Sequence, residues 1–127
     1  MRLSKNFTLR EFKSKDKSRM SEDVLSNVKD LACSLQVLRD FLGEPIRVNS
    51  GYRSPEHNKA IGGVPNSQHV LGKAADIKVK GVETEDLYLL IESLIGYGDM
   101  LEGGLGLYDS FVHYDIRGVK ARWNYKI

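Results

Sequence analysis

The chain contains few residues that could form disulfides or bind a transition metal: one cysteine, Cys33, and three histidines among 127 residues. A single cysteine excludes an intramolecular disulfide framework and any cysteine-rich zinc cluster. A bound metal would therefore need histidine, aspartate or glutamate ligands, and the available histidines are His57, His69 and His113. Cys33 falls near the apolar stripe of a predicted helix, so we expect it to be buried.

Long apolar runs are also absent from the sequence. The N-terminal residues contain no apolar run of signal-peptide length, and no stretch approaches the ~20 residues of a membrane span. We therefore expect cytoplasmic synthesis and no membrane insertion, with export or release left to another system. The length and composition fit one globular domain, 1–127, that is large enough to bury a core.

Positive charge is concentrated at the N-terminus. Residues 1–20 carry seven basic and two acidic side chains, whereas the whole chain has a formal net charge of +2. A basic arm of this kind can approach nucleic acid or another anionic polymer. Nucleic-acid-binding motifs are absent, so we expect a solvated, partly flexible arm and no nucleic-acid partner. Phe7, Leu9 and Phe12 form a short segment within it that could pack on the body.

Capping residues and apolar spacing predict a small α+β domain. Ser21 and Gly43 bound a helix whose apolar residues recur at helical spacing. A glycine-rich segment at 103–107 leads into a turn. The other predicted elements are helices over 56–61 and 83–95 and strands over 46–49, 75–79 and 111–117. This pattern indicates helices packed on one face of a mostly antiparallel sheet.

The predicted strands have one apolar and one polar face, because successive side chains of a strand alternate. Positions 75, 77 and 79 are apolar, as are 112, 114 and 116. The opposite faces gather Asp76, His113, Asp115 and Arg117. Solvated sheet faces usually carry lysine, threonine, glutamate or serine, so this grouping indicates a site on the face away from the helices.

A metal site is one interpretation of this polar face. His69 and Asp76 lie seven residues apart, which on a continuous helix would separate them by ~10 Å, too far for one ion. Gly72 interrupts the segment, so a loop can return His69 to the strand that carries Asp76, and His113 would complete the set. Two imidazoles and one carboxylate suit Zn²⁺ with an open position for water. On spacing alone, a metal-free core or surface histidine is the stronger interpretation.

Longer motifs resemble the zinc D-alanyl-D-alanine carboxypeptidase family, which includes phage L-alanoyl-D-glutamate endopeptidases and shares its metal site with hedgehog-type domains. The likeness covers nearly the whole chain. It rests on SGYRSPEHN at 50–58, on the S-x-H-x6-D pattern at 67–76, and on FVHYDIR at 111–117 followed by ARW at 121–123. The resemblance raises the zinc interpretation above its metal-free alternative and leaves His57 as a structural or surface residue.

The resemblance implies roles for individual residues. One Zn²⁺ per chain would be held by His69, Asp76 and His113. Arg53 matches the family arginine that binds a substrate carboxylate or the peptide near the scissile bond, and Ser67 would hydrogen-bond substrate or a ligand.

The implied activity is hydrolysis of a peptide bond in the peptidoglycan stem, of the D-Ala-D-Ala carboxypeptidase or L-Ala-D-Glu endopeptidase type. We expect a monomer. Tyr52, Tyr108 and Trp123 are candidates to line the substrate groove, although packing is the stronger interpretation of each. The missing export signals, together with a cell-wall substrate, suggest a phage lysin released to the wall.

One position departs from the family pattern. Much of the family has an acidic residue three positions before the final histidine ligand as general base, and Ser110 stands there in this chain. We expect Asp115 to act as the base, with Asp109 as the alternative. Asp115 has a second interpretation of nearly equal weight, as a support for a ligand or an ion-pair partner of Arg117. If neither carboxylate serves, the chain would be a non-catalytic zinc-containing module that binds cell wall or protein.

Overall fold

The computed structural model describes residues 1–126, which form helices and a single five-stranded sheet. The expected helices and strands are found close to their predicted bounds, and two strands, β3 at Gly104–Leu107 and β5 at Ala121–Asn124, are additional. In chain order the elements are a 3₁₀ helix at Leu9–Phe12, α1 at Glu22–Leu42, β1 at Arg47–Ser50, α2 at Pro55–Ala60, β2 at Ala74–Lys78, α3 at Thr84–Gly96, β3 at Gly104–Leu107, β4 at Val112–Asp115 and β5 at Ala121–Asn124.

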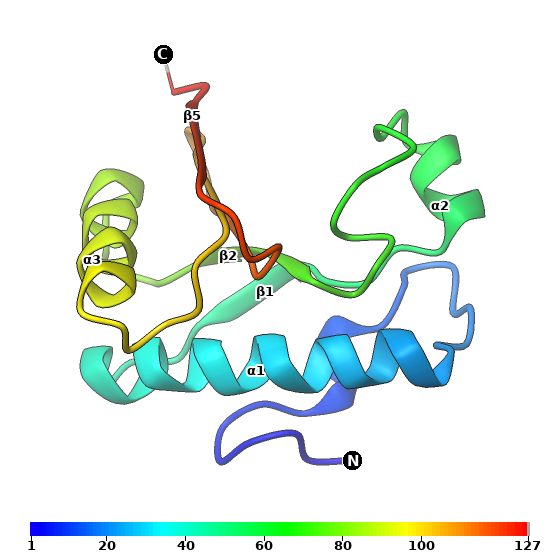
Figure 1. Cartoon of the computed structure of the whole chain (residues 1–127), viewed down its shortest axis with the longest axis horizontal. Coiled ribbons are helices and arrows are strands. Elements are labelled where there is room, and N and C mark those ends of the chain that lie inside the picture. The colour runs from blue at the N-terminus through cyan, green and yellow to red at the C-terminus, as the bar shows by residue number, and fades with distance from the viewer. Residues whose placement is uncertain (127) are drawn as a thin grey trace.

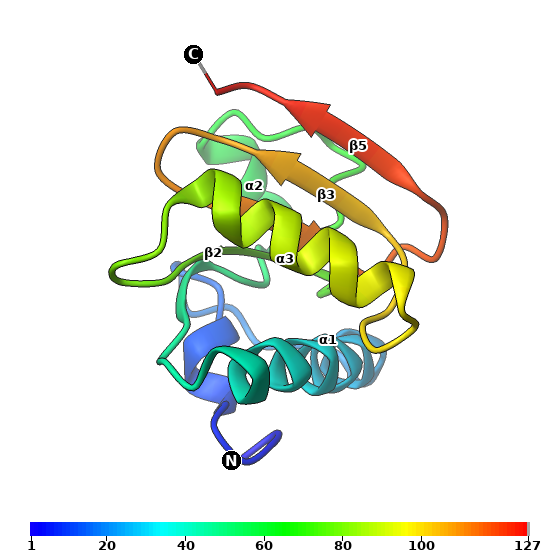
Figure 2. The ribbon, with the colours of Figure 1, turned by 90° about the vertical axis from the view of Figure 1, so that its left-hand side faces the viewer.

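The sheet is mixed but mainly antiparallel, in the strand order β1-β2-β4-β3-β5. The three pairings from β1 to β3 are antiparallel, and β5 joins β3 in parallel. Figure 2 shows β3 and β5 side by side with the same direction, above α3 in this view. The predicted α+β class is therefore confirmed, with one parallel edge strand added to it.

Local signals fix the ends of α1 as the sequence predicts. Ser21 Oγ accepts a hydrogen bond from Val24 N at 3.2 Å, and Gly43 closes the helix in the left-handed region with a φ of 67°. Cys33 is exposed, so the expected burial is wrong. The reason is helical geometry: Cys33 lies two residues from the buried Leu31 and two from the buried Leu35, and two residues turn a helix by about 200°.

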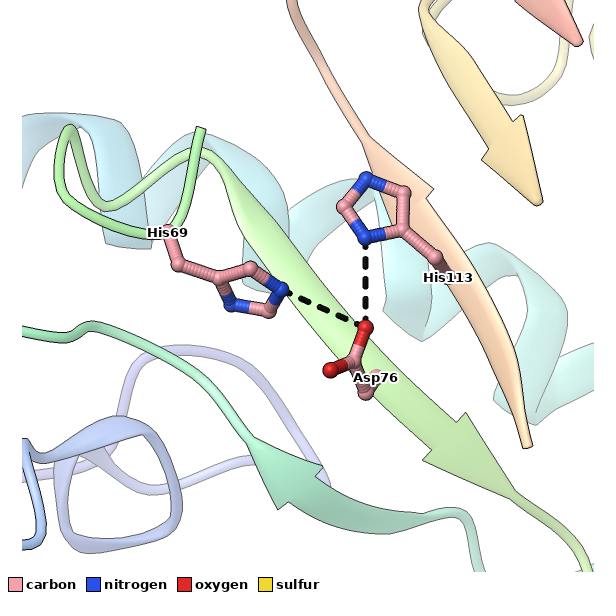
Figure 3. A group of neighbouring side chains, drawn as sticks. All are labelled: His69, Asp76 and His113. Atoms are coloured by element: carbon pink, nitrogen blue, oxygen red, sulfur yellow. Dashed lines mark hydrogen bonds and ion pairs between the residues drawn. The ribbon is translucent and has the colours of Figure 1, made fainter. Parts of the chain in front are cut away.

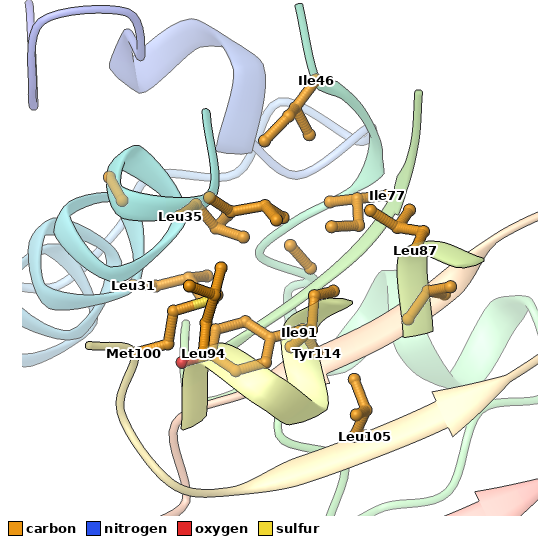
Figure 4. Packing of buried hydrophobic residues seen from close by; sticks show 14 of the residues in the cluster. Leu31, Leu35, Ile46, Ile77, Leu87, Ile91, Leu94, Met100, Leu105 and Tyr114 are labelled. Atoms are coloured by element: carbon orange, nitrogen blue, oxygen red, sulfur yellow. The ribbon is translucent and has the colours of Figure 1, made fainter. Parts of the chain in front are cut away.

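The core lies between α1, α3 and one face of the sheet (Figure 1, Figure 4). Leu31 and Leu35 of α1 and Ile91 of α3 pack there with Ile77 of β2 and Tyr114 of β4. Tyr114 donates to Leu101 O at 2.7 Å and its hydroxyl lies 2.6 Å from Ser34 Oγ, so its polar atom is satisfied inside the core. The apolar residues on this face of β2 and β4 therefore pack against both long helices, α1 and α3.

Of the helices within residues 1–126, none combines the length and apolarity that a bilayer crossing requires.

The basic N-terminal segment divides into two kinds of side chain. All seven lysines and arginines of residues 1–20 are exposed, as expected of a solvated arm. Phe7 and Phe12, however, are fully buried in the core, so the segment packs on the body through its aromatic residues. Asp16 accepts hydrogen bonds from Ser14 and from Ser54, the N-cap residue of α2, which ties the segment to that helix.

Candidate metal centre

A single row of residues crosses the sheet on the face away from the core. The strand register places Asp76 of β2 opposite His113 of β4, His113 opposite Gly106 of β3, and Gly106 opposite Trp123 of β5. Because residues directly opposite one another share a face of the sheet, this row forms the floor of the site. The alternation of polar and apolar positions thus predicts the faces of β2 and β4 correctly.

The structure brings His69, Asp76 and His113 together. Each offers one ligand atom, and these atoms lie within 4.8 Å of one another. His69 Nε2 lies 3.3 Å and His113 Nδ1 3.2 Å from the same carboxylate oxygen, Asp76 Oδ1 (Figure 3). All three side chains are buried. The three predicted ligands therefore converge on one point from two strands and a loop.

His69 reaches this point because the loop before β2 turns sharply. Gly72 has a φ of +76°, and a Cβ at this position would meet the side chain and backbone of Val24 on α1 at 2.9 Å. Only glycine combines that backbone conformation with so close an approach. Arg53 N donates to His69 O at 3.0 Å, which holds the loop beside the end of β1. The return of His69 toward Asp76 through Gly72 follows the sequence prediction.

The second nitrogen of each imidazole has its own hydrogen-bond partner. His69 Nδ1 lies 2.8 Å from Gly51 O, and His113 Nε2 lies 2.7 Å from Asp115 Oδ2. Both partners are acceptors, so each ring can donate an N–H there. With a metal bound, the nitrogen that faces Asp76 would then supply its lone pair to the ion. Histidines that bind metals usually donate their other N–H in this way. The donor set of two imidazole nitrogens and one carboxylate oxygen therefore fits a Zn²⁺ ion.

Ionisation of the cluster follows from its contacts. Burial opposes the charge on Asp76, but hydrogen bonds from His113 and His69 outweigh it and hold the pKa of Asp76 below its usual range. Burial also opposes the charge on His113, yet the carboxylates of Asp115 and Asp76 together raise the pKa of His113. The polar face thus supplies an ionised carboxylate, which is the form that a cation requires.

Asp115 lies behind His113 and is completely buried. Its Oδ2 accepts from Arg117 Nη2 at 2.7 Å as well as from His113, and its Oδ1 accepts from Arg117 Nε at 2.9 Å and Gly104 N at 2.8 Å. The His113 ring separates this carboxylate from the nitrogen that faces Asp76. These contacts match the alternative role suggested for Asp115 in the sequence analysis, in which it supports the ligand His113 and pairs with Arg117.

A cavity of about 360 Å³ opens over the cluster. Of the residues expected to contact substrate, Arg53, Ser67, Tyr108 and Trp123 line it. Asp76 is the single carboxylate among the lining residues within 1–126.

Two expected residues lie outside this cavity. Tyr52 is buried, and it lies against the N-terminal segment of the chain. Its backbone N–H donates to Phe12 O at 2.8 Å. The structure therefore does not bring Tyr52 to the groove. Asp109, the alternative base, lies at a different depression, beside Lys78 and Ser110.

Arg53 is held at the cavity by three neighbours. Its Nε donates to Ser50 Oγ at 3.2 Å, Nη1 to Asn58 Oδ1 at 3.4 Å and Nη2 to Asp76 Oδ2 at 3.5 Å. These contacts orient the Arg53 guanidinium beside the cluster. Because its contact with the Asp76 carboxylate is long, the guanidinium is not held in a close ion pair. Gln68 adds a buried acceptor to the same wall, since its Oε1 has no hydrogen-bond partner among residues 1–126.

Sequence reasoning missed the role of two glycines in β3. A Cβ at Gly104 would collide with the Asp115 carboxylate, and one at Gly106 with the Trp123 ring. The bare polar face of β3 lets Trp123 approach His113, with ring centroids 5.0 Å apart. The Gly-Leu-Gly-Leu alternation is a period-two pattern that could have revealed both the strand and its empty face.

Helices on one face of a sheet, with an oriented His-Asp-His set on the other, define a candidate metal-binding domain. The family model for peptidase M15 matches residues 5–115, so the chain belongs to the peptidase M15 family. A 44-residue stretch is 48% identical to the zinc D-Ala-D-Ala carboxypeptidase of Streptomyces albus G. That match covers 34% of this chain and 17% of the relative. The family resemblance seen in the sequence motifs is confirmed.

Proposed function

We propose that the chain is a zinc-dependent peptidase that hydrolyses a peptide bond in the stem of peptidoglycan, of the D-Ala-D-Ala carboxypeptidase or L-Ala-D-Glu endopeptidase type. The observation that carries this proposal is the convergence of His69 Nε2 and His113 Nδ1 on Asp76 Oδ1, with the other ring nitrogens held by acceptors. Membership of the peptidase M15 family and the partial match to a zinc D-Ala-D-Ala carboxypeptidase support the substrate class.

The chain's own residues would bind and orient the peptide. When bound, zinc lowers the pKa of a water molecule and polarises a carbonyl group. Arg53 offers a guanidinium to a substrate carboxylate at the edge of the cluster. Ser67 lies on the same wall, where its hydroxyl can hydrogen-bond the peptide backbone.

Asp115 in this proposal orients His113 and does not take a proton from water. Its carboxylate accepts from His113 Nε2, Arg117 and Gly104, and the imidazole ring stands between it and the substrate side. By accepting a hydrogen bond from His113 Nε2–H, Asp115 favours the tautomer in which Nδ1 would bind the metal. It is therefore a positioning residue.

A non-catalytic zinc-containing module that binds cell wall or protein is the second candidate. It is favoured by one specific observation: the described residues that line the cavity include no carboxylate besides Asp76, itself a candidate ligand. Ser110 occupies the position where much of the family has its acidic residue. Such a module would bind zinc and stem peptides without cleaving them.

His113→Ala is the direct test, with His57→Ala as its matched control. His57 is a half-buried histidine of α2 outside the cluster. We expect about one zinc per chain in the wild type and in His57→Ala, and neither zinc nor murein hydrolysis in His113→Ala. Metal content by elemental analysis and fragment release by mass spectrometry measure the two effects. Zinc binding and peptide binding without any cleavage would establish the second candidate.

A further inference from the structure

A second arginine, Arg117, lines the same cavity as Arg53. The two guanidinium groups lie at opposite ends of one chain of contacts. Arg53 touches Asp76, Asp76 touches His113, His113 touches Asp115, and Asp115 touches Arg117. Two of the candidate metal ligands, Asp76 and His113, therefore lie between two cationic groups that both reach the cavity.

The pairing of Arg117 with Asp115 uses only one side of its guanidinium. Nε and Nη2 donate to the two oxygens of Asp115 at 2.9 and 2.7 Å. Nη1 makes no hydrogen bond within residues 1–126, and 28% of the side chain is exposed. A guanidinium carries five N–H donors, and the Nη1–Nη2 edge can bind a second carboxylate in a bidentate manner. Arg117 therefore presents a preoriented, unused donor edge.

Trp123 holds this edge in place. The guanidinium carbon of Arg117 lies 5.5 Å from the Trp123 ring centroid, within the range of a cation–π contact. The ring is itself fixed, because Trp123 Nε1 donates to Tyr108 Oη at 3.0 Å and the missing side chain of Gly106 makes room for it. An arginine held by a buried carboxylate and an aromatic face loses little further side-chain entropy on binding an anion.

We propose that Arg117 and Trp123 form a second carboxylate subsite, separate from Arg53. The substrate would then be a stem peptide with two carboxylates within reach of the scissile bond. A D-Ala-D-Ala terminus carries one carboxylate near its scissile bond, whereas a free stem tripeptide carries two: the α-carboxylate of its γ-linked D-glutamate, next to the L-Ala-D-Glu bond, and the carboxylate of its C-terminal residue. This inference deepens the proposed function and rests on it. Under this inference, the preferred substrates are stem peptides in which the α-carboxylate of D-glutamate is free.

The test compares two peptides that differ in one group. One is the stem tripeptide L-Ala-γ-D-Glu-L-Lys, and the other carries a carboxamide in place of the D-glutamate α-carboxylate. Zinc-loaded wild type should bind the acid about tenfold to a hundredfold more tightly than the amide, measured by calorimetry, since a charge-assisted hydrogen bond is lost. kcat/KM for the two peptides should show the same preference.

Arg117→Gln should remove this preference by weakening binding of the acid while changing that of the amide by less than about threefold. Arg117→Lys should keep part of the preference, because it retains the charge without the planar fork. Arg53→Gln should weaken both peptides and preserve the preference between them. Zinc content of each variant is measured in parallel, so that a loss of metal is distinguished from a loss of the subsite.

Equal binding of acid and amide by the wild type, or binding of neither, overturns the subsite. So does an equal loss for both peptides in Arg117→Gln, because that result assigns Arg117 solely to the support of Asp115. Binding with the expected preference but no cleavage supports the subsite and refutes the peptidase proposal. Cleavage without preference refutes the subsite and leaves the peptidase proposal standing.

Discussion

Side chains on both faces of strands β2 and β4 are buried, but different interactions accompany their burial. On one face Ile77 and Tyr114 are fully enclosed by α1 and α3, where area removed from water supplies the stabilisation. On the other face Asp76, His113 and Asp115 are nearly as enclosed, but each polar atom there has a named partner. Residues adjacent in sequence therefore serve the core and the candidate metal centre in alternation.

This difference separates stability from function along the same strands. Burying a charge costs free energy unless it is paired, so the polar face contributes little net stability for its degree of burial. Its arrangement is instead explained by what it can bind. Substitutions on the core face should lower stability without altering the metal set, whereas substitutions on the polar face should change metal binding whatever their effect on stability.

The largest effect on stability is expected for Ile77→Ala, one residue from Asp76. Ile77 is completely buried in the core, and removing its side chain should lower the free energy of unfolding by about 2–5 kcal/mol. Denaturant titration measures this loss. Zinc content at temperatures where the variant is folded should stay at about one ion per chain. Loss of zinc from the folded variant would show that the two faces are not independent.

A smaller effect is expected for Asp115→Asn on the polar face. If Asp115 positions His113, zinc affinity should fall about tenfold to a hundredfold, and activity should return at high zinc. Competition with a chromophoric chelator measures the affinity. If Asp115 is the general base, activity would be lost at saturating zinc while affinity stays unchanged. The same pair of measurements on Asp109→Asn tests the alternative base.

The smallest effect is expected at Asp16, which lies on neither face. Hydrogen bonds from Ser54, Ser14 and Ser18 hold the pKa of Asp16 below its usual range. A depressed folded-state pKa gives stability that is present above the unfolded pKa of about 3.9 and is lost as the pH falls below it. Asp16→Asn should therefore lower the unfolding midpoint at pH 7, and its difference from wild type should shrink below about pH 4. A difference that stays constant with pH would contradict this assignment.

The long-range parts of the fold were the least accessible to sequence reasoning. The ends of α1 and the faces of β2 and β4 depend on local signals, namely a serine cap, a closing glycine and alternation, so they could be predicted. The parallel pairing of β3 with β5 joins segments separated by β4, and no local pattern encodes such a pairing. Cys33 was misplaced because nearness in sequence to an apolar stripe is not nearness on the helix surface.

For the candidate site, too, the local features could be predicted and the long-range contacts could not. Gly72, which interrupts the segment between His69 and Asp76, and the family motif suffice to bring His69 to Asp76 and His113, because an interruption by glycine and the face of a strand are local features. Tyr52 was misplaced since its environment depends on Phe12, about forty residues away in the chain. The unused donor edge of Arg117 depends on its contacts with Asp115 and Trp123, so only the structure reveals it.

The central claim is that the polar face of the sheet binds zinc in order to cleave stem peptides. Mass spectrometry of purified murein tests it most directly, after incubation with the zinc-loaded protein, the chelated protein and the chelated protein resupplied with zinc. The proposed function predicts new peptide ends at a single type of stem bond in the first and third samples and none in the second. Undiminished cleavage by the metal-free protein, or intact murein in all three samples, would contradict it.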